Sequence, residues 1–186
     1  MNKFSRLVLV AMAVSLTLIL TVSQAGALDR LTPELTPEQH SKVVSNCYSI
    51  KTSLNQLRAS DALLRVNRGQ IYESISGKLM ERFNYRASSN DFDTSGLLAM
   101  SNSYDTRLGY FRTHYDAYAR QLDEAIKIDC TTKPDEFHQS VMLARDKRGL
   151  VRDDIKMLHA HIDDYRGEVV QIKQLLNKLE EGSDGR

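Results

Sequence analysis

The sequence predicts an all-α fold, namely an antiparallel up-down-up bundle of three long coiled-coil helices. The first observation is compositional: 186 residues contain 3 prolines, 9 glycines and no tryptophan, which suits long helices better than a sandwich or barrel. The second is periodicity, because apolar residues recur at alternating spacings of four and three over about 36–85, 94–129 and 134–181. Long helices joined by short turns pack as antiparallel neighbours. At ~1.5 Å per residue, the first and third would each be ~70 Å long.

The N-terminus has the pattern of an export signal. Lys3 and Arg6 precede an apolar run over residues 7–22, and Ala25 and Ala27 follow in an A-x-A arrangement. This order predicts a signal peptide over the first 27 residues. An uncleaved membrane anchor stays open as the alternative, since the run falls just short of the ~20 residues that a spanning helix prefers. In either case the remainder is expected to be exported, as a periplasmic, cell-surface or secreted protein.

The exported part is a single domain with a balanced charge. Residues 28–35 are expected to be a linker, residues 36–182 the bundle and residues 183–186 a disordered tail. Lys3 and Arg6 are two of the 25 basic residues, which leaves 23 basic against 24 acidic residues after the signal. A nucleic-acid-binding protein would show a basic excess. We therefore expect no nucleic-acid partner, and membrane contact only through the N-terminal segment if it is uncleaved.

The first helix is predicted to start at Thr36. Thr36 and Gln39 have the spacing of a capping box, and Pro37 stands at the first helical position, where its missing N–H costs nothing. The apolar series that follows is Val43, Cys47, Ile50, Leu54, Leu57, Leu64, Ile71, Ile75 and Leu79. Asp61 and Arg68 take two positions in this seam. A turn is predicted over residues 86–96 from its Ser, Asn, Asp and Gly content, with Asp93 or Thr94 capping the next helix.

The second and third helices continue the pattern. The second series is Leu97, Tyr104, Leu108, Phe111, Tyr115, Tyr118, Leu122 and Ala125. After a turn containing Pro134, the third series is Phe137, Val141, Ala144, Arg148, Val151, Ile155, Leu158, Ile162, Tyr165, Val169, Ile172, Leu176 and Leu179. Six heptads of this kind indicate coiled-coil packing. The tyrosines of the second helix are read as core rather than as a binding stripe.

Cys47 and Cys130 are expected to form a disulfide. Both lie in the exported part, where oxidation is the default. In an antiparallel hairpin, residues at equal depth mirror each other about the turn, and the point midway between these cysteines falls between residues 88 and 89, inside the predicted turn. The bridge would close the end of the hairpin far from that turn. In the chain-entropy model a loop of this length contributes roughly 4–5 kcal/mol.

The same mirror reasoning predicts a seam ion pair between Asp61 and Arg148, with Asp116 as a third member. Arg68 reflects to Gly109, where the missing side chain would leave room for a guanidinium. Polar seam residues usually set register at some cost in stability. The functional alternative is a polar ligand pocket at this level of the core.

Two motifs resemble metal sites only in part. In HAHIDD (residues 159–164), the two histidines at i and i+2 point about 200° apart on a helix, so pairs of His159 with Asp163 and of His161 with Asp164 are preferred. In DFDTSG (residues 91–96), the position that needs a bidentate Glu in a calcium loop is Asn102. A capped turn is the better interpretation. We expect no metal, no cofactor and no catalytic residue, and therefore no enzyme, because no nucleophile motif, phosphate loop or dinucleotide fingerprint is present.

Two resemblances are found. LTPEQ (residues 35–39) resembles the L-T-x-x-Q motif of the helical periplasmic chaperones related to the Spy and CpxP proteins, although the neighbouring LTPEL lacks the final Gln. SDALLRVNRGQIYESISGKLMERF and IDCTTKPDEFHQSVMLARDKRGLV are similar to uncharacterised exported helical proteins of candidate-phylum bacteria. The first resemblance implies chaperone activity, and the second implies an envelope or secreted helical protein.

The function expected is therefore non-catalytic, with a structural or protein-interaction role at the cell envelope. The alternative is a periplasmic holdase for unfolded envelope proteins, which would need a concave apolar face; a small-ligand sensor would need a cavity near Asp61. A protein partner is expected. Mirror arithmetic makes Leu175, Leu176 and Leu179 project beyond the first helix, where they either pack on the turn holding Phe92, which we favour, or form a partner surface.

Overall fold

The computed structural model describes the backbone of residues 34–183 and the side chains of residues 34–178. The predicted signal peptide, most of the linker and the last residues of the tail lie outside the described residues. The chain divides between Glu34 and Leu35, and the described part of the second unit is residues 35–183.

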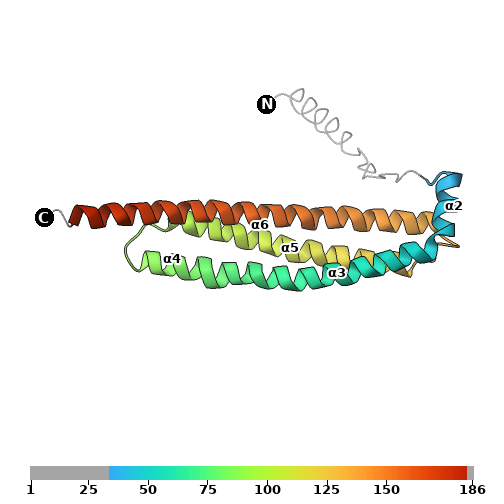
Figure 1. Ribbon diagram of the computed structural model, residues 1–186, viewed down its shortest axis with the longest axis horizontal. Coiled ribbons are helices and arrows are strands. Elements are labelled where there is room, and N and C mark those ends of the chain that lie inside the picture. The colour runs from blue at the N-terminus through green and yellow to red at the C-terminus, as the bar shows by residue number, and fades with distance from the viewer. Residues whose placement is uncertain (1–33, 184–186) are drawn as a thin grey trace, which may run out of the picture. The chain divides into compact units, whose positions relative to one another are not determined.

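This unit is all-helical, as the sequence predicted, and residues 34–183 contain no strand. Its elements are α2 (Pro37–Ser45), α3 (Cys47–Ser74), the π-helical segment η1 (Ile75–Met80), α4 (Glu81–Ser88), α5 (Ser95–Lys127) and α6 (Pro134–Ser183). The expectation that residues 36–85 form one uninterrupted helix is therefore wrong. It is divided into α2, α3, η1 and α4, whereas α5 and α6 are single helices (Figure 1).

The start of α2 carries the predicted capping box. The Thr36 hydroxyl accepts a hydrogen bond from the Gln39 amide at 3.2 Å, and Gln39 Oε1 accepts one from the Thr36 amide at 2.9 Å. The helix then breaks at Asn46, whose backbone has φ −105° and whose side chain donates to the Lys42 carbonyl. Asparagine competes for backbone groups in this way and favours helix ends. The chain changes direction here and continues as α3 (Figure 1).

The second and third predicted series form the core. The residues predicted on α5 are all buried except Tyr115, which packs partly buried against the core. On α6 the buried residues of the predicted series are Phe137, Ala144, Val151, Leu158 and Tyr165. These recur every seven residues, as the heptad pattern requires.

The buried face of α3 differs from the predicted one after Asp61. The residues that are buried are Asp61, Gly69, Tyr72, Met80, Asn84 and Ala87, whereas Leu64, Ile71 and Leu79 are exposed. The buried residues of this face are on average farther apart in the sequence than the residues of a heptad seam. The π-helical turn of η1 holds one more residue per turn than an α-helix, and this keeps the face turned inward.

Tyrosines of the neighbouring helices lie against this buried face. A buried phenol needs a hydrogen-bond acceptor. Tyr118 donates to the Asp61 carboxylate, Tyr104 to the Tyr72 carbonyl, and Tyr165 to the side chain of Asn84. Polar and small positions of α3, η1 and α4 therefore face inward, and the aliphatic row is turned outward.

Contacts between the long elements give their relative directions. From the disulfide between Cys47 and Cys130 to the edge-to-face rings of Tyr72 and Phe111, residue numbers rise along α3 and fall along α5. Between α3 and α6 they rise together, from the Asp61–Arg148 pair to the hydrogen bond of Tyr72 with His159. The unit of residues 35–183 is elongated, with α5 lying along α6 (Figure 1).

Candidate functional site

The predicted disulfide is present at one end of the long elements. Cys47, the first residue of α3, bridges Cys130 in the turn between α5 and α6, with Cα atoms 5.6 Å apart. Both cysteines are buried beside Phe137 in a separate small core, against which Val43 and Val141 pack. The bridge therefore joins the start of α3 to the α5–α6 turn at the point where a small apolar cluster excludes water.

Asp61 and Arg148 are brought together by the structure. Arg148 donates from Nε and Nη2 to the two carboxylate oxygens at 2.7 and 3.1 Å. The third member is Tyr118, whose hydroxyl donates to Asp61 Oδ2 at 2.7 Å. The expectation that Asp116 would join them is wrong, because Asp116 is exposed and Tyr118 points inward two residues later. Both carboxylate oxygens of Asp61 therefore accept hydrogen bonds from side chains of the protein itself.

The electrostatics of this cluster follow from its geometry. Burial disfavours the ionised form of Asp61, but the hydrogen bonds from Arg148 and Tyr118 outweigh it, and the pKa of the carboxyl is lowered. The hydrogen bond to Asp61 raises the pKa of Arg148. Burial and the neighbouring carboxylate raise the pKa of Tyr118, so that it remains a donor. All three groups therefore stay in the forms that bind one another.

The prediction that Arg68 would occupy space at Gly109 is wrong. Arg68 is exposed, and nothing lies within 4 Å of the position that a Cβ would take at Gly109. The inward cation is Arg65, whose Cζ lies 5.4 Å from the Phe111 ring centroid and 5.6 Å from that of Tyr115. Its Nη1 occupies the space where a Cβ of residue 69 would lie. Gly69 is therefore the glycine that makes room for a guanidinium.

A second buried carboxylate was missed by the sequence reasoning. The side chain of Asp154 is 2% exposed and accepts from Arg107 at 3.0 Å and from His114 Nδ1 at 2.6 Å. His114 also stacks on Tyr110. The available signal was spacing, because Asp154 lies three residues after one core residue and four before the next.

The two motifs that partly match metal sites have other partners. His159 contacts the Tyr72 hydroxyl at 3.1 Å, and the salt bridges of the described residues do not include the expected pairs with Asp163 and Asp164. In the turn, Asp93 accepts a hydrogen bond from the Ser95 amide at 2.9 Å, which lowers the pKa of its carboxyl. This bond satisfies the amide of the first residue of α5, whereas the N-cap residue Thr94 makes no side-chain capping bond. Among residues 34–178, no three His, Cys, Asp or Glu side chains are grouped so as to hold a metal ion.

Two of the three leucines expected near the end of α6 can be placed. Leu175 is 51% exposed and Leu176 is 39% exposed, so the favoured expectation that they pack on the turn is wrong for both. Phe92 instead packs against the main core, as Ile172 does. The side chain of Leu179 lies outside the described residues.

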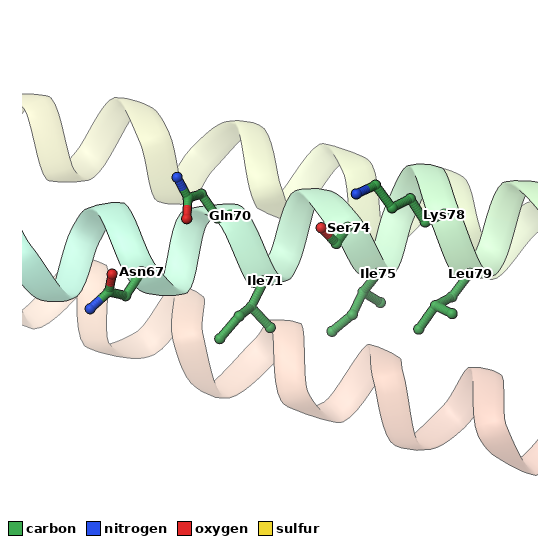
Figure 2. A pocket seen from close by; sticks show the side chains of 7 residues that line it. All are labelled: Asn67, Gln70, Ile71, Ser74, Ile75, Lys78 and Leu79. Carbon is green, nitrogen blue, oxygen red and sulfur yellow. The ribbon is translucent and has the colours of Figure 1, made fainter.

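A shallow groove runs along the outer surface of α3 and η1. It lies between two rows of side chains: Asn67, Ile71, Ile75 and Leu79 on one side, and Gln70, Ser74 and Lys78 on the other (Figure 2). The first row points toward the side on which α6 runs in this view. Ile71 and Leu79 of this row are exposed although the sequence placed them in the core, whereas Ile75 packs partly buried against the core. The outward rotation of α3 therefore creates an apolar surface that the sequence pattern did not predict.

No family model, no curated protein and no solved structure matches this chain. Within the described residues, no helix is both long enough and apolar enough to cross a membrane.

Proposed function

We propose that the protein is exported and non-catalytic, with a structural or protein-interaction role at the cell envelope. In this proposal, α3 to α4, α5 and α6 act as an up-down-up coiled-coil bundle that holds or spaces a partner protein. The observation that carries it is the disulfide between Cys47 and Cys130 at one end of long packed helices. Disulfides persist in oxidising compartments, which is consistent with the signal-like N-terminus.

The use of the buried polar groups also supports a non-catalytic role. Catalytic carboxylates are held ready for a substrate, often with a pKa raised toward neutrality. Asp61 instead has a lowered pKa and is bound by Arg148 and Tyr118. Asp154 is likewise bound by Arg107 and His114. Both carboxylates connect helices to each other.

The test is the intact mass of the endogenous protein from its envelope fraction, with and without reductant. We expect the mass of a chain that starts near residue 28. Reduction should raise this mass by that of two hydrogens. A full-length mass would instead indicate an anchored protein with the same exported domain. A full-length protein with two free thiols would contradict both the export of a soluble domain and the role of the disulfide.

A holdase for unfolded envelope proteins is the second candidate. The groove on α3 favours it, because Ile71 and Leu79 expose apolar surface without a covering element. A holdase suppresses aggregation of many unfolded clients at stoichiometric ratios, whereas a structural protein binds one folded partner. Light scattering of a reduced, aggregating protein, with and without this chain, separates the two functions.

A further inference from the structure

The outward face of α3 and η1 carries a row of apolar side chains that is interrupted by Asn67. Leu63, Ile71 and Leu79 are 64%, 57% and 62% exposed, and Ile75 lies between the last two. They are spaced by multiples of four, so they follow one ridge of the helix. From Leu63 to Leu79 the ridge is about 24 Å long at 1.5 Å per residue. Figure 2 shows that Ile71, Ile75 and Leu79 point the same way from α3 and η1.

The neighbouring edge of α6 carries a row of basic residues between Arg145 and Lys173. One heptad position of α6 holds a basic residue in five successive heptads: Arg145, Arg152, His159, Arg166 and Lys173. All five are exposed. His159 contacts Tyr72 on α3, so this row borders α3, because residues seven apart lie on one face of a helix.

Basic residues of α3, η1 and α4 complete the rim. Arg68, Lys78 and Arg82 are exposed, and Lys78 lines the groove itself. Among the described residues, no salt bridge involves Arg68, Lys78, Arg82, Arg166 or Lys173; Arg152 reaches only its neighbour Asp153, at 3.7 Å. The chain as a whole has 25 basic and 24 acidic residues. The basic rows are therefore a local feature of the molecule, and the exposed acidic residues Glu81 and Asp163 lie next to them.

We propose that this basic-apolar face, formed by the ridge Leu63–Leu79 and the basic row of α6, binds an acidic amphipathic helix of a partner protein. The proposal rests on the interaction role proposed above and names its surface. An apolar stripe one helix wide, flanked by charge, is the arrangement that receives a helix in a groove. Opposite charge across such an interface gives specificity and a faster encounter.

The charge also argues against a second copy as the occupant. A two-fold symmetric contact would place the same surface of each copy against itself. The basic rows would then face each other, and like charges across an interface repel. A partner whose helix has Glu or Asp on both sides of an apolar stripe meets no such repulsion.

The test uses a fluorescein-labelled peptide of three heptads, with two Leu in each heptad and Glu and Ala at the other positions. Its binding to the oxidised chain from residue 28 to the C-terminus is followed by fluorescence anisotropy. Saturable binding is expected. Ile71→Ser with Leu79→Ser, and separately Arg152→Glu with Arg166→Glu, are each expected to weaken it about tenfold or more, as loss of central interface residues does. The same peptide with Lys in place of Glu should not bind.

Matched controls lie on other faces of the molecule. Leu143 is 43% exposed and Arg120 is exposed, so Leu143→Ser and Arg120→Glu remove equivalent groups away from the groove. Both should leave binding unchanged within about twofold, since surface substitutions away from a contact have small effects. Thermal unfolding followed by circular dichroism verifies that every variant folds.

Three results would overturn the proposal. The first is the absence of saturable peptide binding, or an equal loss in the control variants. The second is co-sedimentation with anionic phospholipid vesicles that depends on Ile71 and Leu79, without peptide binding. The third is a dimer in analytical ultracentrifugation that Ile71→Ser with Leu79→Ser dissociates. The intact-mass test is independent of all three, so export and the disulfide could stand while the groove assignment fails.

Discussion

Arg148 and Asp61 are 87 residues apart in the chain, yet they meet through two hydrogen bonds of 2.7 and 3.1 Å. The pair connects α6 to α3 at the level where Tyr118 of α5 also donates to the carboxylate. One side chain therefore ties the three long helical stretches together. Such a group is suited to setting the alignment of helices along their axes.

Removing Asp61 should destabilise the protein more than removing a surface partner. Asp61→Ala leaves the buried Tyr118 hydroxyl without its acceptor and Arg148 without its partner. We expect a loss of roughly 2–3 kcal/mol in the free energy of unfolding, below the value for a fully buried pair because Arg148 is half exposed. Asp123→Ala, which breaks the exposed pair with Arg58, should cost less than about 1 kcal/mol. Urea unfolding measures both, and equal losses would contradict the tying role.

The contribution of Asp61 should depend on pH in the acid range. Burial opposes its ionisation, but its hydrogen bonds lower the pKa of the carboxyl in the folded state. A folded-state pKa below the unfolded value of about 3.9 gives stability that is fully present above that value. It is lost as the pH falls through the folded-state pKa. The difference in unfolding free energy between the wild type and Asp61→Asn should thus be constant from about pH 7 to 5 and shrink below about pH 4. A difference that grows toward low pH would show that the sign is wrong.

Loss of the disulfide should destabilise the end that it closes. The bridge joins residues 83 apart, and the chain-entropy model gives about 4–5 kcal/mol for such a loop. Cys47→Ala with Cys130→Ala should lower the urea midpoint accordingly. Amide hydrogen exchange should rise most in α2 and the start of α3, and least around Tyr165, whose hydroxyl bonds Asn84 at the other end. Uniform loss of protection would mean that the bridge is not a local clamp.

Two glycines should respond oppositely to alanine. At Gly109 an added Cβ meets nothing within 4 Å, so Gly109→Ala should stabilise α5 by about 0.5–1 kcal/mol through its helix propensity. At Gly69 the Cβ would displace the Arg65 guanidinium from the rings of Phe111 and Tyr115. Gly69→Ala should therefore gain nothing or lose up to about 1 kcal/mol. Thermal melts of the two variants decide this, and equal stabilisation would contradict the packing of Arg65.

Tyr165 provides a test in the alkaline range. Burial raises the pKa of its phenol to about 12, above the ordinary value of about 10. A raised folded-state pKa gives stability that is complete below about pH 10 and is lost as the pH rises toward 12. Tyr165→Phe should remove that part of the alkaline loss, and should cost about 1 kcal/mol at neutral pH through the bond to Asn84. Ultraviolet titration of tyrosinate, compared between the two proteins, measures it.

The features that could be read from the residues alone depend on local chemistry or on counting along helices. The capping box at Thr36 needs only neighbouring residues, and the long apolar repeat of α6 determines its buried face. Cys47 with Cys130, and Asp61 with Arg148, follow from equal distances about the turns, because a helix rises by a constant step per residue. These predictions hold as long as the paired helices rise by the same distance per residue.

The buried face of α3 beyond Asp61 was decided by tertiary packing. Counting favours Leu64, Ile71 and Leu79, but the buried hydroxyls of Tyr104 and Tyr165 need acceptors, and they bond the Tyr72 carbonyl and the Asn84 side chain, two residues of a different face. The cost of an unpaired buried hydroxyl is comparable to the gain from burying an aliphatic side chain. The buried face therefore includes residues that satisfy these hydroxyls, and Ile71 and Leu79 are left exposed along the groove. No single-helix pattern contains that competition, because its two sides lie on different helices.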